Sequence, residues 1–309
     1  MALWLALLLP ACAVRPEAAV SSRFALFVLG TAQDGGMPHL GCDRQCCSEA
    51  RRTGRTLHPA SLGVVDRESG ALLLIEATPR IEEQLALFHR LAGTTGRGRQ
   101  PVDAVLLTHA HIGHYLGLAL FGREVAASRG VATHCSQRMA AFLTANGPWK
   151  QLVELGQLAL HPFAPGVAIE PLPGLLVLTF SVPHRDEFSD TMAYVLVGPR
   201  RRVLFVPDVD AWDRAPGLLQ QLMHGVDVAY IDGTFYDGRE LPERDLAEIR
   251  HPLMTDTMAR LETTAAAKGG CVRFLHCNHT NPVLHDEVLR AAIERRGFGL
   301  AQLGEGVEL

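Results

Sequence analysis

The chain has 309 residues, of which 48 % are hydrophobic and 20 % charged, and its formal net charge at pH 7 is −4. This is the composition of an ordinary globular protein with enough chain to bury a core. The small negative charge argues against a nucleic-acid-binding surface, which needs many Lys and Arg residues to neutralise phosphates. It does not exclude a small phosphorylated substrate. The sequence contains no apolar run of the roughly 18 residues that a membrane-spanning helix needs.

The first 22 residues allow two interpretations. A short apolar segment, residues 3–9, leads into Leu9-Pro10-Ala11-Cys12, which resembles the cleavage box of bacterial lipoproteins and would place a lipid anchor at Cys12 in the cell envelope or periplasm. No Lys or Arg precedes that segment, so a tail docked on a cytoplasmic protein, or a misassigned start, is the other interpretation. We expect one domain over residues 23–309. The oligomeric state stays open, a homodimer included.

Apolar segments bounded by turn residues predict strands and helices along the chain. We expect strands at residues 24–30, 61–65, 71–75, 104–107, 131–135, 175–182, 192–197, 203–206, 226–231 and 271–275. Helices are expected at residues 79–91, from about Gly117, and at 215–223, 255–268 and 285–296. No Pro/Gly-rich linker divides the chain. This order predicts an α/β fold with helices outside two sheets.

Two loops are candidates to line a binding site. The loop of residues 31–39 contains Asp34 and two glycines that permit close backbone approach, although a bare turn is as good an interpretation. The polar loop from Gly238 to His251 is a candidate cover, with Tyr236 or His251 contacting a substrate. A plain surface loop is the alternative there.

The most informative stretch is Thr108-His109-Ala110-His111-Ile112-Gly113-His114, which follows the apolar run of residues 104–107. While the chain is still extended, His109 and His111 project to the same side, and His114 closes back on them as the chain turns. Neutral imidazole is the commonest metal ligand in proteins. The stretch therefore predicts a metal site at the end of a buried strand.

Further metal-ligand residue types follow other predicted strands. His184 follows the strand at 175–182, Asp208 follows the strand at 203–206, and His276 and His279 follow the strand at 271–275. Each one alone is better explained by a turn cap or a simple hydrogen bond. Together they match the nitrogen and oxygen ligands of a two-metal hydrolytic centre.

This order of His-x-His-x-x-His, His, Asp and His after apolar strands resembles the metallo-β-lactamase-fold hydrolases. The resemblance covers nearly the whole chain after residue 22 and implies an αββα four-layer sandwich. Within that superfamily the chain is most similar to pyrroloquinoline quinone biosynthesis protein B, through the glycine-rich loop with its cysteine cluster, Asp232-Gly233-Thr234-Phe235 and His279-Thr280-Asn281-Pro282. It also resembles the cyclic-phosphate phosphodiesterase of phosphonate breakdown.

The resemblance implies a ligand for each position of a two-ion centre. The first ion would be held by His109, His111 and His184, the second by His114 and His276, with Asp208 bridging the two. The family pattern has an aspartate before the third histidine, as a ligand of the second ion and a proton acceptor, but this chain has Gly113. The second site is therefore weaker, takes a different ion, or is completed by another carboxylate, for which the candidates are Asp34, Asp186 and Asp190.

A separate cysteine cluster predicts a structural metal site. Cys46 and Cys47 are adjacent and therefore poorly placed to form a disulfide with each other. Thiolates from such a loop, together with distant ligands, make a closed zinc site. The resemblance to the phosphodiesterase implies Cys42, Cys47 and His279 as ligands, with Cys46 as the fourth or as an alternative. A reduced, metal-free cluster is the other interpretation.

We expect a metal-dependent hydrolase that uses a metal-activated water on a small-molecule substrate, by analogy a phosphodiester or another small ester. One or two zinc ions, alternatively iron or manganese, would be the cofactor, and Asp208, His114, Asp34 and His251 are the candidate catalytic residues. The alternatives are an iron-dependent oxidoreductase or hydroxylase related to the quinone-biosynthesis protein, and a non-catalytic, metal-stabilised binding protein.

Overall fold

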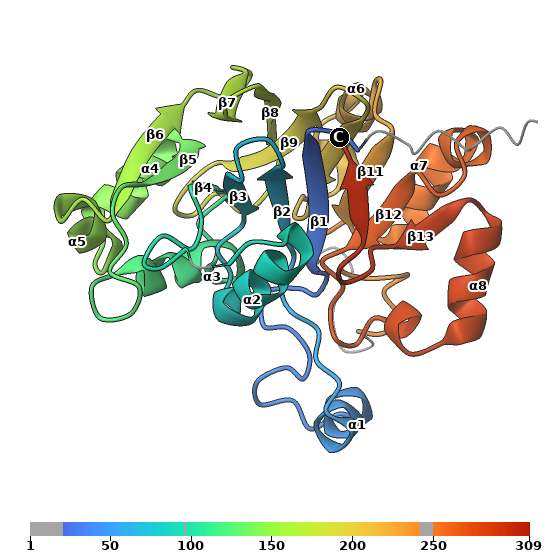
Figure 1. The fold of residues 1–309 in the computed structure, drawn as a ribbon. Helices are drawn as coiled ribbons and strands as arrows, with labels where there is room; N and C mark the ends of the chain where they lie inside the picture. Colours follow the sequence, from blue (N-terminus) through green and yellow to red (C-terminus); the bar gives the residue numbers. More distant parts are fainter. Residues whose placement is uncertain (1–20, 96, 242–249) are drawn as a thin grey trace, which may run out of the picture.

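The computed structural model describes residues 21–95, 97–241 and 250–309. In these residues two sheets of seven strands pack face to face, and helices cover their outer faces (Figure 1). The expected lipoprotein segment with Cys12 lies outside the described residues, as does most of the loop proposed as a cover. Among the described helices, none is long and apolar enough to cross a membrane.

Both sheets are mixed. The first has the order β14 (Gly306–Glu308), β1 (Phe24–Gly30), β2 (Ser61–Asp66), β3 (Leu72–Ile75), β4 (Ala104–Leu106), β5 (Val131–Ser136) and β6 (Leu158–Phe163). The second has the order β13 (Phe298–Leu300), β12 (Val272–Leu275), β11 (Val228–Asp232), β10 (Arg202–Val206), β9 (Thr191–Val197), β8 (Leu175–Val182) and β7 (Ile169–Leu172). Every residue of β2 and β3 is buried, because one face meets the other sheet and the opposite face meets helices.

Three apolar layers hold the sandwich together. The inner layer joins the two sheets, with Leu62 and Ile75 of the first sheet packed with Tyr194 and Phe205 of the second. The two outer layers pack α2 (Ile81–Ala92), α4 (Gln137–Ala145) and α5 (Trp149–Glu154) on the first sheet, and α6 (Leu218–Met223), α7 (Met254–Ala267) and α8 (Glu287–Arg295) on the second. The expected αββα four-layer sandwich is confirmed.

The sequence-based prediction differs from the structure in several elements, and α1, β13 and β14 are among those that it missed. The helix expected from about Gly117 is a single turn, α3 (Ile112–Tyr115), followed by a 3-10 helix over Leu116–Phe121. Four elements between residues 137 and 172 (α4, α5, β6 and β7) were not predicted. The start of α4 did carry a signal, since Ser136 caps the helix by accepting a hydrogen bond from the Met139 amide at 3.1 Å.

Strand direction brings the candidate ligands to one edge of the sandwich. In the first sheet β3 is parallel to β4, and β1 and β3 are both antiparallel to β2. In the second sheet β10, β11 and β12 are parallel, and β8 and β10 are both antiparallel to β9. The carboxyl ends of β1, β3 and β4 therefore lie at one edge of the first sheet, and those of β8, β10, β11 and β12 at one edge of the second. Beyond this edge a long loop carries α1 (Gln45–Thr53), which lies apart from the sheets (Figure 1).

Candidate metal centre

Three imidazoles and a carboxylate form the first cluster of the site. One ligand atom from each of these residues lies within 4.8 Å of every other; they are His109, His111, His184 and Asp208. His109 Nε2 is 2.9 Å from His111 Nδ1, and His184 Nε2 is 3.2 Å from the same atom. Nitrogens bound at about 2.0–2.1 Å around one zinc ion lie at comparable separations.

A second cluster joins the end of the first sheet to the end of the second. His114 Nε2 is 3.3 Å from Asp34 Oδ1, and His276 Nε2 is 3.7 Å from the same oxygen. Asp34 belongs to the loop after β1, whereas His276 follows β12 directly. The structure thus brings Asp34, one of the three carboxylates considered for the incomplete site, to the two histidines expected there.

Asp208 lies between the two clusters. Its Oδ2 atom is 3.2 Å from His184 Nε2 and 3.4 Å from His109 Nε2 in the first cluster, and 3.7 Å from His114 Nε2 in the second. Burial opposes ionisation of this carboxyl group, but the surrounding histidines hold its pKa well below its usual range. A buried carboxylate in this position is suited to bridge two cations.

The other two carboxylates considered for the second site are occupied elsewhere. Asp190 accepts a hydrogen bond from the Ser136 hydroxyl group. Asp186 is exposed and accepts from the Thr191 hydroxyl group at 3.3 Å. Neither belongs to any of the described groups of residues that could hold a metal ion.

Each of the five clustered imidazoles has an oxygen near its second nitrogen. These oxygens fix which nitrogen faces the cluster, as partners of metal-bound histidines do. The pairs are Thr108 Oγ1 with His109 at 2.9 Å, Glu187 Oε2 with His111 at 3.0 Å, Glu76 Oε2 with His114 at 3.2 Å, Asp210 Oδ1 with His184 at 3.5 Å and Thr234 Oγ1 with His276 at 2.9 Å. The sequence analysis assigned this role to none of these residues.

Glu76 is the most informative of the missed partners. It directly follows β3 and is fully buried, and its other oxygen accepts the Thr108 amide at 3.0 Å. Glu76 has φ 72° and His276 has φ 60°, and among the described residues Ala127 is the one further non-glycine residue with positive φ. Such backbone is disfavoured for these residue types and clusters at functional sites. A carboxylate directly after an apolar strand was the available signal, as it was for Asp208.

The chemistry of the site fits divalent cations. Among the described residues, Asp34 Oδ1, His114 Nε2, Asp208 Oδ1 and His276 Nε2 are buried without a hydrogen-bond partner, which is rare for polar atoms. Burial lowers the pKa of His109 well below its usual value, which leaves the neutral ring that a ligand must be. Burial acts in the same direction on His114, but Glu76 and Asp34 raise its pKa well above the usual value. The carboxylates that favour a proton there would also attract a cation.

His251 lies on the edge of the site. Its Nδ1 atom is 2.9 Å from Asp232 Oδ2 and 3.2 Å from Asp208 Oδ1. Burial lowers its pKa, but Asp232 and Asp208 outweigh burial and raise the pKa to about 9. Asp232, the last residue of β11, also accepts hydrogen bonds from the amide and hydroxyl groups of Thr234. The structure therefore places His251 beside Asp208, and Asp208, Asp232, His251 and His276 form a further group of residues that could hold a metal ion.

The cysteine cluster forms a separate group beyond the edge of the sheets. The Sγ atoms of Cys42 and Cys47 and a ring nitrogen of His279 lie within 4.8 Å of one another. Cys47 Sγ accepts the His39 amide at 3.2 Å, and burial raises the pKa of this thiol to about 11. Cys46 is not part of this group. It precedes Cys47 on the first turn of α1 and lines a cavity of about 760 Å³.

Comparisons with known proteins agree with this geometry. The family model described as "Beta-lactamase superfamily domain" matches residues 72–276. Coenzyme PQQ synthesis protein B of Methylobacterium sp. (strain 4-46) is 27 % identical over 298 residues, which is 90 % of this chain and 97 % of that protein. The crystal structure of Zn²⁺-bound PqqB from Methylobacterium extorquens matches with a TM-score of 0.78 at 24 % identity, covering 92 % of this chain and 100 % of that one.

A second solved structure, of a diphosphatase from the PhnP family, matches with a TM-score of 0.66 at 21 % identity, covering 93 % of this chain and 97 % of that one. The family model covers more than half of the chain and includes all the histidines and carboxylates of the two clusters except Asp34. The chain belongs to the beta-lactamase superfamily and has the metallo-β-lactamase fold.

Proposed function

We propose that the protein is a metal-dependent hydrolase that acts on a phosphodiester or another small ester. The observation that carries the proposal is the position of Asp208, whose carboxylate faces one histidine cluster on each side. Divalent ions held by these clusters would polarise the scissile group and supply a water nucleophile at neutral pH. The similar solved structure of a diphosphatase from the PhnP family supports a phosphorylated compound as the substrate class.

The side chains of this protein would bind the ions and orient the substrate. His109, His111 and His184 would hold one ion, and His114 and His276 the other. With Asp208 and Asp34 as the ligand carboxylates, a pair of divalent ions keeps an excess of positive charge. That excess favours an anionic ester over a neutral one.

His251 is the residue that we propose contacts the substrate. Asp232 holds its Nδ1 atom at 2.9 Å, and this contact orients the ring at the edge of the two clusters. From there it can hydrogen-bond the oxygen that leaves when the ester is cleaved. We keep Tyr236 as a candidate contact, because its half-buried side chain precedes the loop that ends at His251.

A model aryl phosphodiester tests this function. Protein loaded with Zn²⁺ or Mn²⁺ should release the aryl alcohol, and His109→Ala should abolish release together with binding of one ion. His224, which is exposed and far from the clusters in sequence, supplies the matched histidine-to-alanine control. A metal-loaded wild-type protein that turns over no phosphodiester, ester or amide contradicts the proposal.

An iron-dependent oxidoreductase is the second candidate. The curated relatives are named coenzyme PQQ synthesis protein B, and the two clusters at the sheet edge contain only nitrogen and oxygen ligands, which suit Fe(II). Protein purified without chelator distinguishes the two functions. Bound iron together with substrate-dependent oxygen uptake supports oxidation, and zinc or manganese with ester cleavage supports hydrolysis.

We further propose a structural zinc ion at Cys42, Cys47 and His279. The His39 amide donates a hydrogen bond to Cys47 Sγ, as the partners of thiolate ligands typically do. The His39 ring stacks on the His279 ring, with 4.6 Å between the ring centroids. Zinc binding would require both thiols to ionise, against the effect of burial on Cys47.

A further inference from the structure

The Asp34 carboxylate lies beside Gly113, in the same cluster as His114 and His276. The family pattern puts an aspartate at position 113, and this chain has Gly113. A Cβ atom built on Gly113 would lie 2.1 Å from Asp34 Oδ1 and 2.7 Å from Asp34 Cγ. The Asp34 carboxylate therefore fills the space into which a side chain at position 113 would project.

The glycine is required by this close approach. The same Cβ atom would also lie 2.6 Å from Asp34 Cα, so the backbone of the loop would have to move as well. Gly113 has a negative φ, so nothing in its own backbone demands glycine. If position 113 had merely lost a ligand side chain, any small residue could stand there. Because the Asp34 loop fills the space beside position 113, only glycine fits there.

The loop holds Asp34 at this position through bonds on both sides. The Gln33 amide donates to the Cys277 carbonyl at 3.0 Å, and Asn278 Nδ2 donates to Gln33 Oε1 at 2.6 Å. On the other side the Ala60 amide donates to the Ala32 carbonyl at 2.8 Å. Asp34 Oδ1 itself is buried and has no hydrogen-bond partner among the described residues.

We propose that Asp34 is the carboxylate ligand of the second metal ion and replaces the aspartate that position 113 lacks. The second site is then complete, with His114, His276 and Asp34 as its own ligands and Asp208 shared with the first. The inference rests on the proposed two-ion centre, but it concerns ion binding and can be tested without turnover.

Asp34→Asn tests the proposal, because the amide keeps the shape of the side chain and removes its charge. Zinc content per chain after gel filtration and titration with Co²⁺ or Zn²⁺ are the readouts. We expect wild-type protein to bind one ion more than D34N, or D34N to bind its weakest active-site ion at least about 100-fold less tightly. The cysteine cluster contributes equally to both proteins, so it cancels in the comparison.

Two further variants separate ligand loss from misfolding. Asp186→Asn removes a nearby carboxylate that faces no cluster, and it should leave ion binding unchanged. Gly113→Ala keeps Asp34 but pushes its loop away, so it should weaken the same ion as D34N while thermal unfolding remains cooperative. If G113A does not fold, the comparison of ion binding in D34N and D186N still tests whether Asp34 is a ligand.

The outcomes are distinct. Equal ion content and equal affinity in wild type and D34N overturn the assignment of Asp34, and so does a wild-type protein with a single active-site ion. An ion that is lost in D34N from a wild-type protein without hydrolytic activity contradicts the proposed function and leaves the assignment of Asp34 intact.

Discussion

At the scale of single residues, the geometry of the candidate metal centre depends on side chains that lie outside the two clusters. Glu76 Oε2 lies 3.2 Å from His114 Nδ1, and Glu76 Oε1 accepts the Thr108 amide at 3.0 Å. One buried carboxylate therefore orients both a candidate ligand and the backbone of the histidine stretch. Asp210 holds His184 in the same way, and Arg214 in turn contacts Asp210 at 2.8 Å. Such partners commonly change metal affinity by about 10–100-fold.

Glu76→Gln should therefore weaken binding of the second ion by about 10–100-fold and leave the first ion in place. The amide can still accept from Thr108, but it supplies no negative charge to His114. Competition with a fluorescent zinc chelator measures both affinities. Glu124→Gln is the matched control, because Glu124 is exposed and pairs with Arg123 at 3.2 Å, not with a clustered histidine. An equal loss in both variants would show that Glu76 has no special role.

His251→Ala should keep both active-site ions and lower kcat by about 10²–10⁴-fold, because its contact is with the substrate and not with an ion. Metal content and the rate of aryl phosphodiester cleavage are measured on the same sample, with His224→Ala as the control. Loss of an ion in H251A would instead make His251 a metal ligand.

The sequence predicted the histidines and Asp208 because each follows an apolar strand by a few residues. The oxygen partners were not predictable in the same way. Glu76 meets His114 only because β3 and β4 pair in parallel with Ile75 opposite Leu106, and this register is not written in either strand alone. Asp34 was one of three candidates, and the space beside Gly113 decides between them.

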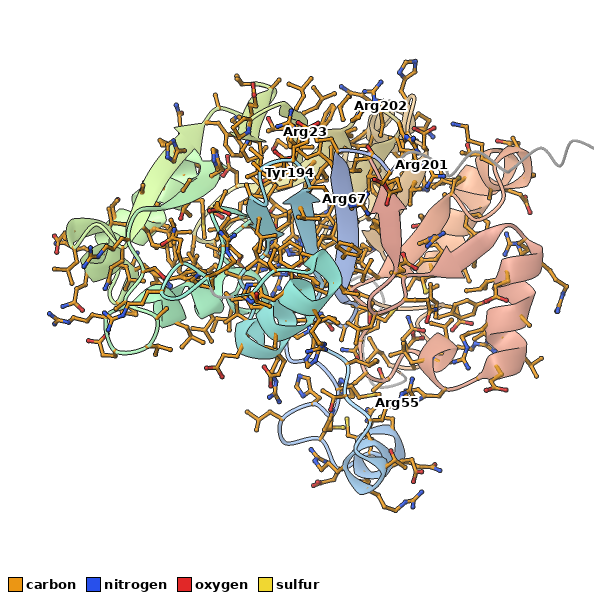
Figure 2. All side chains as sticks on the ribbon, viewed as in Figure 1. Arg23, Arg55, Arg67, Tyr194, Arg201 and Arg202 are labelled. Carbon is orange, nitrogen blue, oxygen red and sulfur yellow. The ribbon has the colours of Figure 1, made fainter. Side chains whose placement is uncertain are left out.

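At the scale of elements, the second sheet holds the histidine stretch of the first. The Tyr194 hydroxyl group on β9 donates to the Leu107 carbonyl, and the Met192 amide at the start of β9 donates to the Thr108 carbonyl at 3.2 Å. Figure 2 shows Tyr194 in the interior of the molecule, among the side chains between the sheets. Strand β9 therefore positions the ligands that follow β4.

Tyr194→Phe should lower the free energy of unfolding by about 1–3 kcal/mol, because it leaves the buried Leu107 carbonyl without this donor. It should also weaken binding of the ion held by His109 and His111. Thermal melts and zinc titration measure the two effects. Tyr230→Phe is the control: its hydroxyl group bonds Glu305, which keeps its contact with Arg273 at 2.7 Å. Unchanged zinc affinity in Y194F would show that β9 does not position the ligands that follow β4.

Long apolar strands were predicted well, because burial on both faces gives continuous apolar runs such as β1. The missed elements had weaker patterns. Strand β6 at the edge of its sheet has two exposed residues, His161 and Pro162, and β13 and β14 are three residues long. Tertiary pairing, and not local periodicity, makes these segments strands.

At the scale of the whole molecule, one loop connects the two metal-binding regions. It leaves β1, contributes Asp34 to the second cluster and then Cys42 and Cys47 to the cysteine cluster. The segment after β12 runs beside this loop, and Ala32 of the loop pairs with Cys277 of the segment. The segment contributes His276 to the second cluster and His279 to the cysteine cluster. In Figure 2, Arg55 lies where α1 meets the rest of the molecule, and it donates to the Leu284 carbonyl at 3.0 Å.

Cys47→Ser should therefore affect both regions. We expect loss of the ion at the cysteine cluster and about tenfold weaker binding of the second active-site ion, because the loop that holds Asp34 loses one of its anchors. Cys46→Ser, one residue earlier and outside the cluster, should change neither. Zinc content and zinc titration of the two variants provide the measurement. An unchanged active-site affinity in C47S would show that the two regions act independently.

The close approach of Asp34 to Gly113 also limits which substitutions position 113 can accept. A chain with a side chain at position 113 cannot bring the Asp34 loop so close, since the Cβ atom would meet Asp34 Cα at 2.6 Å. An aspartate at position 113 therefore requires the Asp34 loop to lie farther away, and the loop in its present position leaves room for glycine alone. In a library randomised at position 113 alone, selection for metal binding should recover glycine.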